Sequence, residues 1–151
     1  MAKGLEKTLQ KLRTHLTASN RFAEVTIGEP FNAPEGLHCA VFLGTTWTVP
    51  KVTLNGSVEE RQVTLRIYRD AVADNREETE VLLAEVVAEV MEDLFGDAEL
   101  NNPSDSTTQL RTLAPTKTVV RFGYQEVKGK LMRIVDILLT LDVDDSFSLA
   151  V

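Results

Sequence analysis

The sequence has few of the residues that several classes of site require, with one Cys, two His, one Trp and two Tyr among 151 residues. A single Cys excludes an intramolecular disulfide and a Cys-based zinc or iron–sulfur site. Basic residues are outnumbered, 16 Lys and Arg against 23 Asp and Glu, which gives a formal net charge of −7. A chain of this sign is poorly suited to gripping nucleic acid, because the phosphate backbone demands clustered Lys and Arg.

Long hydrophobic runs are also missing. The longest uncharged stretch, Leu37–Pro50, is too short to span a bilayer, and the N-terminal residues carry charges where a signal peptide needs an apolar core. Hydrophobic residues make up 43% and charged residues 26% of the chain, which is the balance of a folded domain. We therefore expect one soluble intracellular domain over residues 1–151, with no membrane partner.

Hydrophobic spacing predicts two helices. The first covers residues 3–19, where Leu5, Leu9, Leu12 and Leu16 form one apolar stripe. The second is expected to open with the acidic residues of 70–80, which suit the positive end of the helix dipole, and to end at Gly96. From Val81 to Phe95, 11 of 15 positions are apolar, so this helix has more apolar surface than one sheet face covers.

Strands are predicted at residues 37–47, 58–69, 118–127 and 130–143, with shorter ones near Val25 and at Leu110–Ala114. The segment after Lys130 is the most hydrophobic in the chain, so we expect it in the middle of the sheet. The pattern predicts an α/β (α+β) fold, in which two helices pack on a mostly antiparallel or mixed sheet of four to five strands.

Residues 48–60 are predicted to form a long hairpin arm. Asn55-Gly56 is a strong turn signal, and Pro50 argues against a central strand. Apolar residues on or beside this arm are candidate protein contacts, unless the arm folds back on its own domain. They are Trp47, Val49, Val52 and Leu54.

The last six residues, 146–151, alternate polar and apolar side chains in the manner of an add-on strand. Phe147 and Leu149 are the apolar residues that we take as further candidate contacts in this segment.

No catalytic constellation is recognisable. His38 and Cys39 are neighbours in a predicted strand, so their side chains point to opposite faces and cannot pair as base and nucleophile. The common nucleophile, zinc and phosphate-binding motifs are absent from the sequence. We expect no catalytic residue, no metal and no cofactor.

One acidic cluster leaves a different class open, namely a small metal-dependent enzyme. Its oxygen ligands would suit a divalent cation, although the interpretation we favour is the acid-rich first turn of a helix. The residues are Asp70, Asp74, Asn75, Glu77 and Glu78.

Charge is segregated along the chain. Residues 70–99 hold eleven acids and one base, a net charge of −10, and residues 111–133 hold six bases and one acid, a net charge of +5. Such runs are either solvated faces or complementary surfaces that meet between copies of the chain. Head-to-tail contact of unlike surfaces closes into a ring if the rotation permits. Lys128 and Lys130 are the candidate contacts in the basic segment.

Several short motifs accompany this order of elements. They are Gly36-Leu37-His38, Arg66-Ile67-Tyr68, Gly123-Tyr124, Gly129-Lys130, Met132-Arg133 and Asp136-Ile137. Together with the element order over nearly the whole chain, they resemble the tail terminator proteins of long-tailed bacteriophages (siphoviruses), and more distantly the lambda-type terminator. None of the motifs is a catalytic signature, so the order of elements weighs more than any residue.

The resemblance implies a non-enzymatic structural protein of the virion, which forms a hexameric ring on the head-proximal end of the phage tail tube. Such a ring ends tube polymerisation and offers a docking surface for a head-completion or neck protein, while DNA passes through the lumen without specific binding. The implied partners are further copies of the chain, the tail tube protein and the neck protein. Two alternatives are a head–tail connector one layer nearer the capsid and a monomeric adaptor.

Overall fold

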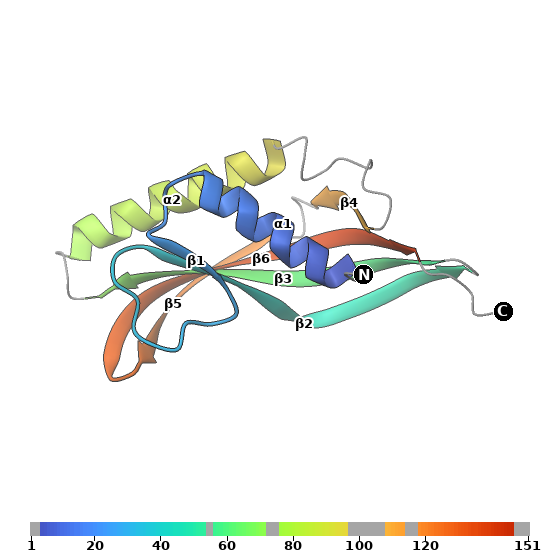
Figure 1. Ribbon diagram of the computed structural model, residues 1–151. Coiled ribbons are helices and arrows are strands. Elements are labelled where there is room, and N and C mark those ends of the chain that lie inside the picture. The colour runs from blue at the N-terminus through green and yellow to red at the C-terminus, as the bar shows by residue number, and fades with distance from the viewer. Residues whose placement is uncertain (1–3, 54–55, 72–75, 97–107, 114–117, 147–151) are drawn as a thin grey trace.

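The computed structural model describes residues 4–53, 56–71, 76–96, 108–113 and 118–146, with side chains at 9–44, 62–71, 76–94 and 118–140. Two helices lie on one face of a single mixed sheet (Figure 1), so the expected α+β architecture is confirmed. In chain order the elements are α1 (Gly4–Ala18), β1 (Glu24–Ile27), β2 (His38–Thr53), β3 (Gly56–Asp70), α2 (Arg76–Gly96), β4 (Thr108–Leu113), β5 (Val119–Val127) and β6 (Lys130–Ser146).

Strand β6 is central, as its hydrophobicity predicts. It pairs with β3 from Met132 to its end at Ser146. On its other side it pairs first with β5 and then, further along, with β4. At the body of the domain the strand order is therefore β1-β2-β3-β6-β5, five strands wide, with β1 parallel to β2 and the other pairs antiparallel.

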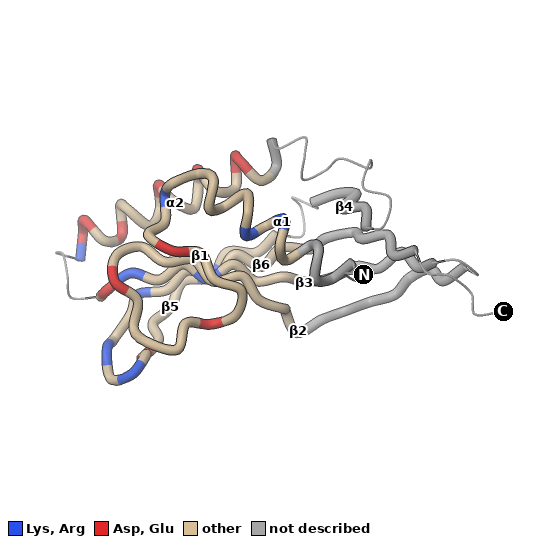
Figure 2. The backbone as a smooth tube through the Cα atoms, in the orientation of Figure 1, with Lys and Arg blue, Asp and Glu red and all other residues tan. Residues whose placement is uncertain are grey.

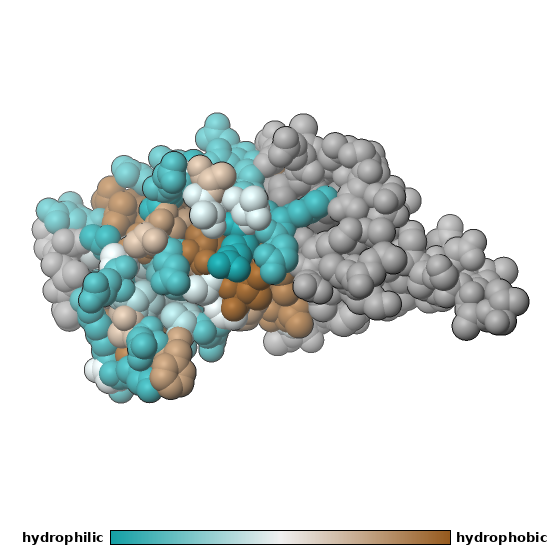
Figure 3. Space-filling view, in the orientation of Figure 1, coloured by the Kyte–Doolittle hydropathy of each residue, from teal (hydrophilic) through white to brown (hydrophobic). Residues whose placement is uncertain are grey.

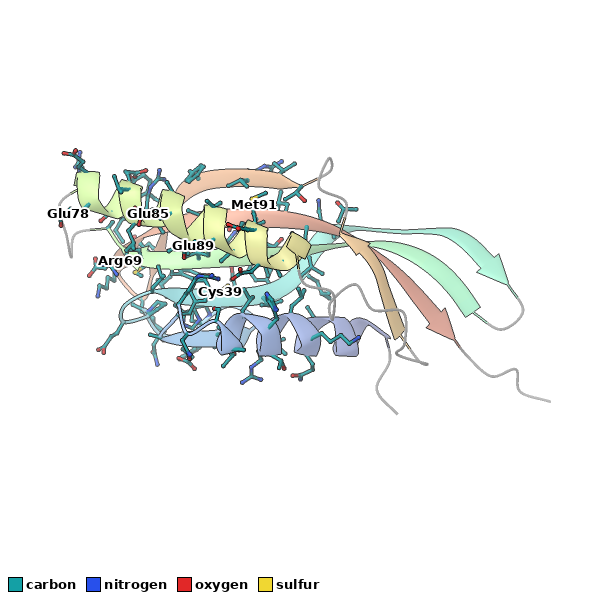
Figure 4. All side chains as sticks on the ribbon, turned by 90° about the horizontal axis from the view of Figure 1, so that it is seen from above. Cys39, Arg69, Glu78, Glu85, Glu89 and Met91 are labelled. Atoms are coloured by element: carbon teal, nitrogen blue, oxygen red, sulfur yellow. The ribbon has the colours of Figure 1, made fainter. Side chains whose placement is uncertain are left out.

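The main core lies between the helices and one face of the sheet. Alternation places Val63, Leu65 and Ile67 of β3 on this face with no exposed surface. Leu12 and Leu16 of α1 are buried against the same cluster. In Figure 4, which looks onto the helices, α1 and α2 run side by side over the sheet, with Cys39 of β2 beneath them.

The opposite face of the sheet carries a second, smaller core under the 28–37 loop that joins β1 to β2. Ala33 from this loop packs against a cluster that includes Tyr68 and Met132. In the body of the sheet, β2, β3, β5 and β6 thus have one face toward the helices and one toward this loop. The two faces define the surroundings of every side chain considered below.

Strands β2, β3 and β6 continue past the helices as an arm (Figure 1). The sequence predicts a hairpin here, and the structure adds β6 as its third strand. Pro50 lies at a register shift between Thr48 and Lys51, where β2 pairs only with β3 among the described strands. An edge strand with a bulge is where a residue without an N–H donor is tolerated.

The start of the second helix differs from the prediction. Asp70 is the last residue of β3, and α2 begins at Arg76. Asp70 still pairs with Met132 in the ladder, so sheet pairing outweighs the preference of an acid for a helix N-terminus. Among the described residues, no helix is long and apolar enough to cross a membrane.

Candidate interaction surfaces

His38 and Cys39 lie on opposite faces of the sheet, as the alternation of strand side chains predicts. Cys39 is fully buried in the core beneath the helices, and burial raises the pKa of its thiol to about 12. The thiol therefore stays protonated and acts as a small apolar side chain. His38 faces the 28–37 loop, where its ring meets the edge of Tyr68 at 5.8 Å between centroids.

Four residues from the motifs quoted above converge on this loop-covered face: His38, Arg66, Tyr68 and Asp136. The guanidinium of Arg66 donates to both carboxylate oxygens of Asp136, at 2.7 and 2.9 Å. Hydrogen bonding to Asp136 raises the pKa of Arg66. A paired, bidentate geometry of this kind fixes two strands rather than providing a reactive base.

Arg66 also fastens the 28–37 loop to the sheet. Its Nη1 donates to Glu29 at 2.6 Å and to Gln125 of β5 at 3.1 Å, and its guanidinium lies 5.2 Å from the ring centre of Phe42. One side chain thus connects β3, β5, β6 and the loop. The polar cluster is explained by this structural role.

The acidic cluster of residues 70–78 does not assemble as a metal site within the described chain. Asp70 accepts from Lys130 Nζ at 2.9 Å at the end of β3. Glu77 and Glu78 are exposed in the first turn of α2, while Asp74 and Asn75 lie outside the described residues. Among the described residues, no group of three His, Cys, Asp or Glu side chains is placed to hold a metal ion.

The basic and acidic segments meet within one copy of the chain. Figure 2 shows acidic positions along α2 and basic positions at the turn between β5 and β6. Lys130 contacts Asp70, and the guanidinium of Arg133 pairs with Glu80 of α2 through Nε at 2.8 Å and Nη2 at 3.2 Å. Part of the charge separation seen in the sequence is therefore neutralised inside the fold.

A cavity of about 290 Å³ opens between the first turns of α2 and the β5–β6 hairpin, on the helix face of the sheet. Ala71, Tyr124 and Leu131 form apolar walls. The remaining lining includes Glu80 and Arg133, whose guanidinium stacks on the Tyr124 ring at 4.6 Å. We call this cavity, with its seven lining residues Ala71, Arg76, Thr79, Glu80, Tyr124, Leu131 and Arg133, the socket.

Thr79 is the unusual member of the socket. Its side chain is 3% exposed, and its hydroxyl has no hydrogen-bond partner. A buried hydroxyl without a partner is costly.

Several large apolar side chains in or near the β5–β6 hairpin are exposed. Phe31, in the 28–37 loop, is 79% exposed and is the most exposed large apolar side chain described. Lys128 Nζ lies 3.9 Å from the centre of its ring. Figure 3 shows a mainly hydrophilic surface on the face it displays, where apolar side chains appear at separate places.

The structure therefore describes only part of the candidate contacts that the sequence indicates. Lys128 and Lys130 are described, and each has a contact within the chain. Trp47, Val49 and Val52 belong to β2, but their side chains lie outside the described residues, as do Leu54, Phe147 and Leu149 altogether. The sequence analysis does not name Phe31 and Tyr124 as candidate contacts. Neither hydrophobic spacing nor a sequence motif distinguishes an exposed aromatic residue from a buried one.

Comparison with known proteins gives no identification. No protein-family model matches the sequence, and no curated protein matches it.

Proposed function

We propose that this chain is a structural virion protein of the tail terminator type, which acts through contacts with copies of itself and with neighbouring virion proteins. The observation that carries the proposal is the arm: β3 and β6 stay paired out to Gly56 and Ser146, past the helix-covered core. Along this arm β2 has a strand partner on one side only among the described strands. Unpaired strand edges are templates for contact with another chain.

The body of the domain adds exposed apolar surface to the arm. Such surface is typical of proteins that bind other proteins. The exposed side chains near the β5–β6 hairpin are Phe31, Phe122, Tyr124 and Leu131, which are 48–79% exposed.

In this proposal six copies form a ring at the head-proximal end of the tail tube. The ring blocks addition of further tube subunits and presents its other side to a neck protein. DNA passes through the ring without being held, which suits a chain with a net charge of −7. The resemblance supplies the ring size and the tube, and the arm and exposed surfaces supply the means of contact.

A reconstitution experiment tests this function. Purified tail tube protein is allowed to polymerise with and without the chain, and negative-stain microscopy records the tube ends and lengths. We expect shorter tubes with a ring at one end. Binding to neck-side proteins while tubes remain uncapped would contradict the proposal and favour a connector.

Deleting Thr48–Glu60 probes the arm in the same assay. Every described residue of the main core lies outside the deleted segment, so we expect the body to fold and capping to fail. The deletion also removes the β3 partners of β6 residues 142–146, so circular dichroism and the unfolding midpoint must be compared with those of the intact chain. Normal capping by a folded deletion variant would exclude the arm as the contact.

A further inference from the structure

The two outermost strands of the sheet body, β1 and β5, each have an edge without a strand partner among the described residues. β1 pairs only with β2, and β5 pairs only with β6, so they form opposite borders of the sheet (Figure 4). β5 pairs without a register shift from Val119 to Val127 and contains no proline. A regular edge of this length is a template for pairing with a strand of another chain.

The free backbone groups of β1 belong to residues whose side chains lie on the helix face. The N–H of Gly28, just after β1, donates to the carbonyl oxygen of Val41 in β2 at 2.8 Å. Because backbone groups alternate in direction along a strand, those of Val25 and Ile27 point away from β2. Val25 packs in the core beneath the helices, so both side chains lie on that face.

The free backbone groups of β5 also belong to residues with side chains on the helix face. Val127 and Lys130 flank the two-residue turn and pair with each other, as a hydrogen-bonded pair does at such a turn. Alternation then points the backbone groups of Val120, Phe122 and Tyr124 away from β6. Val120 packs against the main core, which places all three side chains on the helix face.

We propose that β5 of one copy pairs antiparallel with β1 of the next copy, so that the sheet continues from copy to copy. The proposal rests on the proposed function, because it assigns the contact by which neighbours in the ring meet. From β2 to β5 the strand direction reverses three times, and β1 is parallel to β2. A second copy placed alongside in the same orientation therefore presents β1 antiparallel to β5.

The two edges are different surfaces, so the contact is head-to-tail and closes into a ring when the rotation permits. Residues directly opposite each other in an antiparallel pair have their side chains on the same face. With the helix faces of both copies aligned, Val25 and Ile27 come opposite residues of the set Val120, Phe122 and Tyr124. These are the residues with free backbone groups on both edges, so matching faces and matching hydrogen-bonding groups are achieved in the same registers.

Apolar side chains on the helix face of both edges would be covered by this pairing. Phe122 and Tyr124 of β5 are 53% and 59% exposed, and Ile27 of β1 is 38% exposed. In the register that places Phe122 opposite Val25, Ile27 lies diagonally across from Phe122. Contacts of aromatic with β-branched residues between neighbouring strands stabilise a sheet, and the apolar area withdrawn from water drives association.

The loop-covered face of the two edges carries charges of opposite sign. Arg121 of β5 is exposed and lies opposite Asp136 on that face. Glu24 of β1 has a side chain that is 70% exposed, with one carboxylate oxygen 4.0 Å from His38 Nδ1. In the register described above, Arg121 lies diagonally across from Glu24, within reach of a long side chain. This pair favours β1, rather than a second β5, as the occupant of the edge.

Charge reversal tests this pair by sedimentation velocity of the full chain over a range of concentrations. Arg121→Glu and Glu24→Arg should each weaken self-association by roughly three- to tenfold, because each brings like charges together. An equimolar mixture of R121E and E24R should associate like the wild type, since every contact between unlike copies joins opposite charges. Glu92→Arg is the matched control, because Glu92 is exposed on α2 and lies at neither edge.

A mixture as weak as its separate components would overturn the proposal. If R121E alone loses association and E24R does not, the partner of β5 is a second β5. Circular dichroism and the unfolding midpoint of each variant verify that the fold is kept.

A second pair of variants separates the β5 edge from the arm. Phe122→Thr removes an exposed ring but keeps a residue that suits a strand, and should weaken association by roughly tenfold or more. Leu43→Thr is the matched control, since Leu43 is 49% exposed in β2 and lies outside both edges. Loss of association in L43T but not in F122T would overturn the proposal and assign the contact to the arm.

The outcomes for this contact and for the proposed function are distinguishable. A wild-type chain that stays monomeric at the highest concentration would overturn the pairing of β5 with β1, whereas its capping of tubes would still support the proposed function. A chain that associates through these edges but leaves tubes uncapped would support the pairing and contradict the terminator function.

Discussion

At the scale of single residues, Gly44 shows how closely two strands approach. A Cβ at this position would lie 2.8 Å from the backbone oxygen of Gln62, a distance that a side chain cannot occupy without moving the strand. We expect Gly44→Ala to lower the free energy of unfolding by about 1–3 kcal/mol through overpacking. Urea unfolding followed by circular dichroism measures the loss.

Gly123→Ala is the matched control for this substitution. A Cβ on Gly123 would meet Ile134 Cγ1 at 3.8 Å, which is an ordinary contact, so a change within about 0.5 kcal/mol is expected. Equal losses at the two glycines would show that the approach of β3 at Gly44 is not the cause.

His38 is held neutral by its surroundings. Burial lowers its pKa from the ordinary value of 6.5, against a smaller opposing effect of Glu24. The Thr26 hydroxyl donates to the Gly28 carbonyl at 3.0 Å, so its oxygen accepts from His38 Nε2, also at 3.0 Å. This arrangement places the proton of the neutral ring on Nε2.

The lowered pKa of His38 makes stability depend on pH. Below about pH 6.5 the unfolded chain takes up a proton at His38 while the folded chain does not. The free energy of unfolding therefore decreases as the pH is lowered, until the pKa of the folded state is reached. The decrease is at most about 1.4 kcal/mol per pH unit. His38→Gln should therefore flatten the fall between pH 7 and 5.5. Chemical denaturation across this range, with the same fall in the variant and the wild type, would exclude His38 as its source.

At this scale the sequence predicts which face a strand residue occupies better than whether it is exposed. The opposite orientations of His38 and Cys39 follow from the alternation of a strand alone. The exposure of Phe31 does not, because it depends on how the loop crosses the sheet after β1. Its contact with Lys128 joins residues 97 positions apart, and nothing local encodes it.

At the scale of elements, the β5–β6 hairpin depends on one turn. Lys128 and Gly129 both have positive φ, 50° and 80°, as a two-residue turn of the type I′ class requires. A Cβ on Gly129 would meet nothing within 4 Å, so Gly129→Ala tests the backbone cost alone. We expect a loss of about 1–2 kcal/mol in the free energy of unfolding.

The comparison variant for this turn is Lys128→Asn, which keeps a residue that tolerates positive φ and should unfold close to the wild type. A loss in K128N as large as that in G129A, measured by chemical denaturation, would show that the contact of Lys128 with Phe31 stabilises the hairpin as much as the backbone conformation of Gly129 does.

Element order could be predicted from the sequence because hydrophobic periodicity and turn residues act locally. The central place of β6 follows from its apolar content, the highest in the chain, which a strand with neighbours on both sides can bury. The start of α2 could not be placed, because the acids at 70–80 suit a helix dipole equally well wherever the helix begins. Asp70 pairs with Met132 and contacts Lys130. These long-range interactions keep Asp70 in β3, so the helix begins later.

At the scale of the whole molecule, the sequence overstates the separation of charge. The acidic and basic segments suggest two surfaces for two copies, yet Lys130–Asp70 and Arg133–Glu80 join them within one chain. Reversing Lys130 would therefore disturb its own hairpin as well as any contact with a neighbour. Lys128, which lies over an exposed ring, is the better probe of association because its replacement leaves both ion pairs intact.

The whole sheet has a gradient of protection that hydrogen exchange can measure. Between residues 134 and 138, β6 is paired on both sides, with β3 and with β5, and alternate side chains there are buried beneath the helices. We expect the slowest amide exchange in this stretch and in its β3 partners at 64–68, since their opening requires the whole domain to unfold. β1, a four-residue strand paired on one side among the described strands, should exchange faster. Exchange of β1 as slow as that of β6 would show that β6 is not the most stable centre of the sheet.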